Sequence, residues 1–289
     1  SSVMAVVVTA LMTNYTDVLK SSRSSDLQTL YGGAYYDNEL LRDTSWSILN
    51  QLAGEDEDVG TWNAHRPSDN DRTARWFEDD TLPNILVIGN SHSKDVFNML
   101  HLSSERGHRY EVARFGIATR FPQDQREELF ASPNFGAADI VMIAPRYTDD
   151  AAAFLPELIS EIQATGKTAV VVGNTPEFVS PGTVPIYDWY IQRQVDRRSL
   201  QQMNYIAYGS QANAVEERNT MLREIAQQTG AIYLSRQSVI CSEQARTCTL
   251  ATPEGQKTMY DYGHWTLEGA EYFSKVAAAV DWLGSVFQN

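Results

Sequence analysis

The sequence predicts an α/β protein, a three-layer sandwich in which helices cover both faces of a parallel, doubly wound sheet of about five strands. Two observations lead to this prediction. Short, continuously apolar runs such as residues 85–89 (Ile-Leu-Val-Ile-Gly) are typical of strands buried on both faces. From residue 84 onward these runs alternate with helix-like segments about five times, as in a sheet with crossover helices. We therefore expect the functional residues beyond the carboxyl ends of the strands.

The expected elements follow one another in regular order. Strands are predicted at residues 85–89, 110–115, 138–144, 168–173 and 231–234. Helices are predicted at residues 93–102, 123–130, 150–165, 212–230 and 266–287. Gly166 directly follows one of these helices, where a left-handed residue commonly ends a helix. A long polar and aromatic stretch, residues 174–212, separates the fourth strand from the next helix.

The first part of the chain differs from the rest. Residues 1–83 are predicted to be a helical and irregular extension packed on a main domain at residues 84–289, with helices near residues 16–30 and 38–52 and an acidic loop at 54–70. The apolar start, residues 3–12, is too short to span a bilayer. We interpret it as the remnant of a membrane-linked region, or as a helix or strand packed on the domain.

The charge balance excludes one class of partner. The 289-residue chain has 23 Lys and Arg against 37 Asp and Glu, a net charge of −14. A surface this acidic repels nucleic-acid phosphates and anionic lipid headgroups. We therefore expect no nucleic-acid partner.

The chain has two cysteines, Cys241 and Cys248, with polar residues between them. Two thiols with this spacing make a poor zinc site. A local disulfide is the favoured interpretation, and it would place the protein in an oxidising compartment. The alternative is a pair of free thiols in a cytosolic loop.

A candidate nucleophile follows the first predicted strand. In Gly89-Asn90-Ser91-His92, Gly89 permits a sharp turn, and Ser91 comes at the carboxyl end of the strand as a helix begins. The free N–H groups and positive dipole end of a helix N-terminus stabilise an oxyanion beside a serine nucleophile. The plainer alternative is that this serine only caps the helix.

A candidate base precedes the last predicted helix. His264 is one of five histidines, and it alone lies in a loop with an aspartate, Asp261, three residues before it and a helix start after it. A neutral histidine can take the proton of a serine hydroxyl, and a carboxylate fixes its tautomer. The alternative is an exposed loop with an incidental histidine. Because the two candidates follow the first and last strands, they can meet at one edge of the sheet.

These two segments resemble sequence blocks of the SGNH (GDSL-like) hydrolase superfamily. Gly89-Asn90-Ser91-His92 is similar to the first block, with Asn90 where aspartate is usual, and residues 261–266 are similar to the last, Asp-x-x-His block. The resemblance covers about residues 84–285. It extends in particular to SGNH domains attached to integral-membrane acyltransferase-3 proteins, on three features: the Ser-His dipeptide, the cysteine pair before the last block, and the polar, aromatic extension.

The resemblance implies an SGNH-type fold and a set of site residues. Ser91 would be the nucleophile, His264 its base and Asp261 the orienting carboxylate, with no metal or organic cofactor. Backbone N–H groups of Ser91 and Gly116 would bind the oxyanion. The usual side-chain donor, an asparagine after the third strand, is replaced here by Ala144-Pro145-Arg146-Tyr147. Arg146 would supply the donor, or else pair with a carboxylate.

A further oxyanion candidate and several aromatic residues have two interpretations each. Asn174, after the fourth strand, is a second possible donor or a turn residue. His92 would line the pocket or serve packing, and Trp265 would stack on a sugar or belong to the core. An aromatic cluster in the long stretch would form a carbohydrate-facing lid or anchor that stretch; it comprises Tyr187, Trp189 and Tyr190.

The resemblance also implies a function. It is O-acyl, in particular acetyl, transfer to a cell-surface or secreted polysaccharide through an acyl-enzyme on Ser91. The implied partners are the polysaccharide acceptor, an acyl donor, and a membrane acyltransferase-3 domain in the same full-length chain. The implied location is periplasmic or extracytoplasmic, attached to the membrane. Two alternatives stay open: a secreted carbohydrate O-acetylesterase, and an inactive glycan-binding domain that serves a partner acyltransferase.

Overall fold

The computed structural model describes residues 37–53, 65–79, 81–104, 107, 110–193 and 200–288. The apolar start, the helix predicted near residues 16–30 and most of the acidic loop lie outside these residues. Within the described part of the chain, no helix combines the length and the apolar character needed to cross a membrane.

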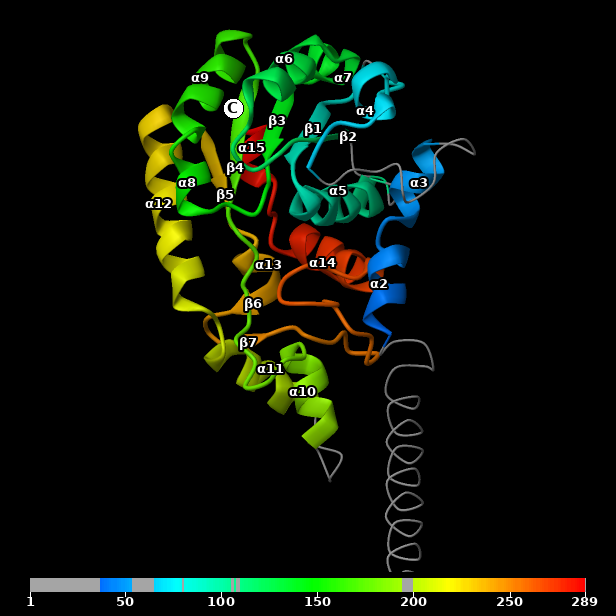
Figure 1. Cartoon of the computed structure of the whole chain (residues 1–289), viewed down its shortest axis with the longest axis vertical. Coiled ribbons are helices and arrows are strands. Elements are labelled where there is room, and N and C mark those ends of the chain that lie inside the picture. Colours follow the sequence, from blue (N-terminus) through cyan, green and yellow to red (C-terminus); the bar gives the residue numbers. More distant parts are fainter. Residues whose placement is uncertain are drawn as a thin grey trace, which may run out of the picture.

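A five-stranded parallel sheet forms the centre of the molecule (Figure 1). Its strands run in the order β2-β1-β3-β4-β5. They are β1 (Asn84–Gly89), β2 (Glu111–Gly116), β3 (Ile140–Ile143), β4 (Thr168–Val172) and β5 (Ile232–Leu234). The chain thus steps outward in one direction from β1 to β2 and then in the other from β3 to β5. This order confirms the predicted doubly wound sheet, and it puts a switch point beside β1.

Alternate residues of each strand enter two different cores, as the period of two in a strand requires. On β1, Ile85 and Val87 join one cluster and Leu86 and Ile88 join the other. All four side chains are fully buried. The sheet is therefore covered on both faces, which confirms the predicted three layers.

The helices divide between these two faces (Figure 1). One face packs against α5 (Ser91–Ser104), α13 (Gln237–Ile240), α14 (Leu267–Ala279) and α15 (Gly284–Phe287). The other packs against α6 (Gln123–Ala131), α7 (Pro133–Ala137), α8 (Asp149–Ala152), α9 (Leu155–Ala164) and α12 (Asn213–Thr229). Helices α5 and α14 lie side by side and are in extensive contact.

Two predicted helices are each broken in two. The helix expected at 150–165 is α8 followed by α9, because Pro156 in the first turn of α9 has no N–H for an intrahelical bond. The helix expected at 266–287 is α14 followed by α15, with Asp281 between them at φ 51°. Gly166 has φ 81°, which confirms the left-handed helix end expected there.

The described part of the N-terminal extension packs on α5. It contains α2 (Asn38–Thr44), α3 (Ser47–Ala53) and α4 (Asp69–Thr73), so the helix expected near residues 38–52 is also two helices. The Asn98 Nδ2 of α5 donates to the Ser45 carbonyl at 2.8 Å, and Lys94 Nζ donates to Ser45 Oγ at 2.6 Å. Trp46 and Leu49 are buried in the same core as α5. The domain boundary at residue 83 stays a prediction.

The long stretch between β4 and α12 holds two further helices, α10 (Ile186–Arg193) and α11 (Leu200–Gly209). Later in the chain, after β5, the strands β6 (Cys241–Ser242) and β7 (Thr247–Cys248) form a small antiparallel pair. Cys241 and Cys248 face each other across this pair and form a disulfide. The predicted disulfide is therefore present.

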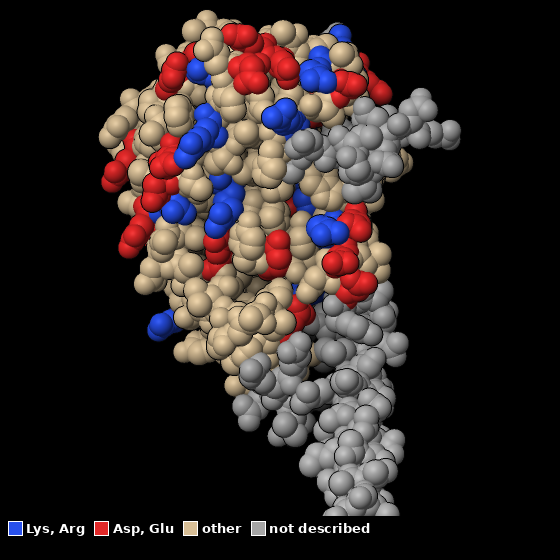
Figure 2. Space-filling model, in the orientation of Figure 1, with Lys and Arg blue, Asp and Glu red and all other residues tan. Residues whose placement is uncertain are grey.

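Charged groups of both signs appear on the face shown in Figure 2. Acidic side chains are prominent along its upper edge and its left side, with basic side chains between them. This distribution agrees with the net charge of −14.

Candidate active site

The turn after β1 sets the position of Ser91. Gly89 has φ +147°, and a Cβ built on it would lie 2.7 Å from the Pro145 backbone nitrogen. Only glycine fits such a close approach at this backbone angle. The chain turns there into α5, so that Ser91 stands at the carboxyl edge of the sheet and begins the helix.

Three residues predicted from the sequence are brought together at this edge. His264 Nε2 lies 2.8 Å from Ser91 Oγ, and His264 Nδ1 lies 2.7 Å from Asp261 Oδ2. The other Asp261 oxygen accepts the backbone N–H groups of Gly263 at 3.0 Å and His264 at 2.8 Å. With the Nδ1 proton held by the carboxylate, Nε2 is free to accept the serine proton. This is the arrangement of a Ser-His-Asp triad.

The Asp261 carboxylate is stabilised in its charged form. Burial opposes ionisation, but hydrogen bonds from the His264 ring and from the backbone N–H groups outweigh it, and they lower the pKa of Asp261. Asp261 is therefore ionised at neutral pH and can hold the histidine tautomer.

Aromatic rings surround His264. The His92 ring lies 4.1 Å from the His264 ring, Tyr260 is parallel to it at 5.6 Å, and Tyr262 meets it edge-on at 5.5 Å. His92 is 2% exposed. Burial holds the pKa of His92 well below its usual value, with a further lowering from His264 and the nearby cations. A neutral His92 can pack on His264 without repelling a proton that the His264 ring accepts.

Asn90 ties the nucleophile turn to the loop after β3. Its Oδ1 accepts the backbone N–H groups of His92 at 3.1 Å and of Arg146 at 3.0 Å. Its Nδ2 donates to Thr119 Oγ1 at 2.8 Å. The Asn90 side chain thus makes hydrogen bonds to the start of α5 and to the loops after β2 and β3. Its amide N–H group already has an acceptor in Thr119.

Two of the expected oxyanion donors already have partners within the protein. The Gly116 N–H donates to the buried Asp71 Oδ2 at 3.0 Å. Asn174 Nδ2 donates to the Tyr147 carbonyl at 3.1 Å, while its Oδ1 accepts the Tyr147 N–H at 2.8 Å. Asn174 thus has the turn role given as its alternative. An oxyanion role for either donor requires an exchange of these bonds.

Arg146 adopts the second of its two predicted roles, because it pairs with a carboxylate. Its Nε and terminal nitrogen both donate to Glu177, the latter at 3.0 Å. The guanidinium is held away from an oxyanion role by this bidentate contact. Of the four expected oxyanion donors, the Ser91 N–H remains at the N-terminus of α5, where the first N–H groups have no intrahelical acceptor.

Arg236 is a site residue that the sequence analysis missed. It lies two residues after the end of β5 and is fully buried. It donates to the carbonyls of Ala144 at 2.7 Å, Pro145 at 3.0 Å and His92 at 3.4 Å, and to Thr175 Oγ1 at 3.3 Å. Burial lowers its pKa to about 10. Its one sequence signal is its place after a strand, where long polar residues are also common in ordinary turns.

The burial of the aromatic residues favours, for each of them, one of the two interpretations given from the sequence. Trp265 is fully buried and packs against Phe273 with centroids 4.8 Å apart, so it belongs to the core and cannot stack on a sugar. Tyr187 and Tyr190 are 2% and 3% exposed. The cluster therefore anchors the long stretch and is not a carbohydrate-facing lid.

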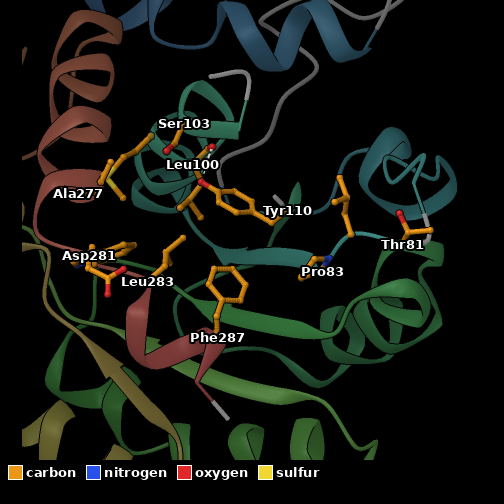
Figure 3. Close-up of a pocket in the computed structure, with 13 residues that line it drawn as sticks. Thr81, Pro83, Leu100, Ser103, Tyr110, Ala277, Asp281, Leu283 and Phe287 are labelled. Carbon is orange, nitrogen blue, oxygen red and sulfur yellow. Dashed lines mark hydrogen bonds between the residues drawn. The ribbon is translucent and has the colours of Figure 1, made fainter. Parts of the chain in front are cut away.

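A cavity of about 800 Å³ lies away from these residues (Figure 3). It is enclosed by the C-terminal ends of α5 and α14 and by α15, with Leu100, Tyr110, Leu283 and Phe287 in its wall. Ser91 is at the other end of α5, and a helix of 14 residues is about 20 Å long. The cavity is therefore separate from the triad. Among the described residues, no cluster of three potential metal ligands occurs.

Comparison with known proteins agrees with this geometry. A family profile described as "SGNH domain (fused to AT3 domains)" matches residues 62–279. The fold is similar to that of a lipopolysaccharide acetyltransferase periplasmic domain from Salmonella ser. Paratyphi A, with 16% identity and a TM-score of 0.54 over 70% of this chain and 85% of that one. No curated protein matches the chain in sequence.

Two esterase structures show weaker similarity. The acetyl xylan esterase AlAXEase is 9% identical, with a TM-score of 0.42 over 68% of this chain and 98% of that one. A catalytic mutant of Axe2, an acetylxylan esterase from Geobacillus stearothermophilus, is 13% identical, with a TM-score of 0.40 over 70% and 94%. The profile match covers most of the chain and confirms the resemblance drawn from the sequence: the chain belongs to the family of SGNH domains fused to AT3 domains.

Proposed function

We propose that this protein transfers an O-acyl group, in particular acetyl, to a polysaccharide through an acyl-enzyme on Ser91. The observation that supports the proposal is the hydrogen-bonded chain from Ser91 Oγ through His264 to Asp261, with distances of 2.8 and 2.7 Å. Membership in the SGNH family agrees with acyl chemistry at a serine.

The first half-reaction makes the acyl-enzyme. Ser91 Oγ attacks the carbonyl carbon of the donor as His264 Nε2 takes the hydroxyl proton, and Asp261 stabilises the imidazolium. The Ser91 N–H and the positive end of α5 stabilise the oxyanion. When the tetrahedral intermediate collapses, the bond to the leaving group breaks, and His264 returns the proton to that group.

The second half-reaction restores the serine. A sugar hydroxyl gives its proton to His264 and attacks the acyl carbon. The bond from this carbon to Ser91 then breaks, and His264 protonates the Ser91 oxygen. The products are the sugar ester and the free enzyme, so that no oxidant, metal or cofactor is consumed.

We further propose that a membrane acyltransferase-3 domain of the same full-length protein supplies the acyl group, on the extracytoplasmic side of the membrane. Two observations favour this setting. The family profile is that of SGNH domains fused to AT3 domains. The Cys241–Cys248 disulfide is typical of an oxidising compartment such as the periplasm.

The two alternatives differ in what the triad does. In an O-acetylesterase, water takes the place of the sugar hydroxyl in the second step, and the same three residues are required. An inactive glycan-binding domain has no need of an aligned triad, and the Ser91–His264–Asp261 chain argues against it.

A serine substitution tests the proposal. We expect Ser91→Ala to lower turnover of 4-nitrophenyl acetate by about 10³-fold or more, with an unchanged circular dichroism spectrum. Ser104→Ala at the far end of α5 is the matched control and keeps full activity. Transfer is separated from hydrolysis by mass spectrometry of an oligosaccharide acceptor. Activity that persists in Ser91→Ala contradicts the proposed mechanism.

A further inference from the structure

Tyr262 is an exposed aromatic residue at the catalytic histidine. It lies between Asp261 and His264 in the chain and is 41% exposed. Its ring meets the His264 ring at 5.5 Å and 67°, and its hydroxyl lies 3.5 Å from His92 Nε2. Tyr262 thus presents an aromatic surface to solvent beside the two histidines that flank the nucleophile.

An ion pair packs on this ring, with the guanidinium over one of its two faces. The Arg146 guanidinium lies 5.0 Å from the centroid of Tyr262 and is bonded at two points to Glu177. The Arg146 side chain is 37% exposed and that of Glu177 is 16% exposed. Because Asn90 Oδ1 binds the Arg146 N–H, the pair is fixed relative to Ser91, the next residue along the chain.

These groups together match the chemistry of a sugar ring. A pyranose has a face of C–H groups that packs on an aromatic ring, and it has hydroxyls that both donate and accept hydrogen bonds. Glu177 offers acceptors and Arg146 offers the N–H groups that Glu177 does not use. Their charges cancel, so the pair has no preference for an anion, unlike an isolated arginine.

We infer that Tyr262 and the Arg146–Glu177 pair form the acceptor subsite, and that it takes a neutral pyranose residue of a polysaccharide. The inference rests on the proposed function. Tyr262 and Arg146 are each tied to a neighbour of Ser91, through His92 and Asn90 respectively. A sugar on this surface therefore presents a hydroxyl to the acyl group on Ser91.

Binding tests the subsite without turnover. The whole chain with Ser91→Ala is titrated with maltotriose, mannotriose and xylotriose, and binding is measured by saturation-transfer NMR. We expect at least one to bind, and Tyr262→Ala in this background to weaken that binding about tenfold. Tyr205→Ala, which removes a 57% exposed tyrosine from α11, is the matched control and leaves binding unchanged. If none of the three sugars binds, or if the two tyrosine variants bind alike, the subsite assignment is wrong.

Kinetic measurements distinguish a Tyr262 that binds the acceptor sugar from a Tyr262 that only shields His264 from solvent. With 4-nitrophenyl acetate as donor and the bound trisaccharide as acceptor, Tyr262→Ala and Glu177→Gln should raise the acceptor KM about tenfold. Their effect on hydrolysis of the donor alone should be several-fold smaller. Equal losses in both reactions would mean that Tyr262 only shields the histidine.

The two proposals can fail separately. If Ser91→Ala keeps its activity while sugar binding depends on Tyr262, the acyl-enzyme proposal falls, and what stands is sugar binding at Tyr262 without the acceptor role. If Ser91→Ala is inactive and the tyrosine has no effect on sugar binding, the subsite falls alone.

Discussion

Asn90 binds Arg146 across the carboxyl edge of the sheet, with Oδ1 accepting the Arg146 backbone N–H at 3.0 Å. The same oxygen accepts the N–H of His92. One side-chain atom therefore sets the distance between the nucleophile turn after β1 and the loop after β3. Aspartate, usual at this position in SGNH sequences, offers the same acceptor, which explains why asparagine is compatible with an intact triad.

Substitutions of Asn90 should distinguish the role of its acceptor oxygen from the role of the rest of the side chain. Asn90→Asp keeps the oxygen, and we expect kcat within about threefold of the wild type, since the Thr119 hydroxyl can donate in return. Asn90→Ala leaves two N–H groups without their acceptor, each at a cost of about 1–3 kcal/mol. We expect a tenfold or larger loss of kcat on 4-nitrophenyl acetate, with a smaller change in KM. An Asn90→Ala variant as active as Asn90→Asp would contradict this role.

His92 should make stability fall in acid. Its folded-state pKa is depressed by burial, so between that value and about 6.5 the unfolded chain binds the extra proton. The unfolded state is then stabilised as pH falls, and the free energy of unfolding decreases by about 1 kcal/mol between about pH 7.5 and pH 5.5. Urea unfolding of the wild type and of His92→Gln at these two pH values measures this decrease in the free energy of unfolding.

The His92→Gln variant should lack this part of the pH dependence. Above about pH 7.5, where neither state of the wild type is protonated at this ring, the two proteins should have parallel stability curves. An unchanged acid slope in His92→Gln would mean that other groups cause it.

Arg236 should stabilise the loops around the site. Arg236→Lys places its donors on one nitrogen, which cannot span the acceptors that Arg236 contacts in three loops. With two or more buried bonds lost, we expect a loss of about 2–4 kcal/mol in urea unfolding and a lower kcat. The exposed Arg223→Lys on α12 is the matched control, with a change within about 0.5 kcal/mol. Equal stability of the two variants would show that the buried contacts contribute little.

The disulfide should stabilise the folded protein by lowering the conformational entropy of the unfolded chain. Its loop is short, since the two cysteines are 7 residues apart, and the chain-entropy relation gives about 2.5 kcal/mol at 25 °C. We expect a Cys241→Ser, Cys248→Ser double variant to lose that much in urea unfolding. Dithiothreitol should bring the wild type to the same midpoint and leave the variant unaffected. A reductant effect on both proteins would point to another cause.

The sheet and the triad could be predicted because their signals are local. A strand such as β1 is buried on both faces and must be apolar throughout, and Gly89 is required where the backbone approaches Pro145. Ser91 and His264 follow strands that the topology brings to one edge. Their contact could thus be predicted from their order along the chain taken together with the resemblance to the SGNH family.

The features that could not be predicted from the sequence depend on partners far away along the chain. Asp71 lies in the extension, and nothing in its surroundings in the sequence indicates that it binds the Gly116 N–H. Arg236 has the same difficulty, because its acceptors are mostly backbone carbonyls, which every residue possesses. Next to the break at Asp281, Trp282 Nε1 donates to the Ser235 carbonyl, another contact far along the chain.

The packing of α5 on α14 has a kinetic consequence. Ser91 begins α5 and His264 comes three residues before α14, so the spacing of these two helices sets the length of the Ser91–His264 hydrogen bond. We therefore expect substitutions of buried side chains on the two helices, such as Val96 and Phe273, to change proton transfer between Ser91 and His264. Substitutions in the core alone can then change the rate of the chemical step, while every group that contacts the substrate stays the same.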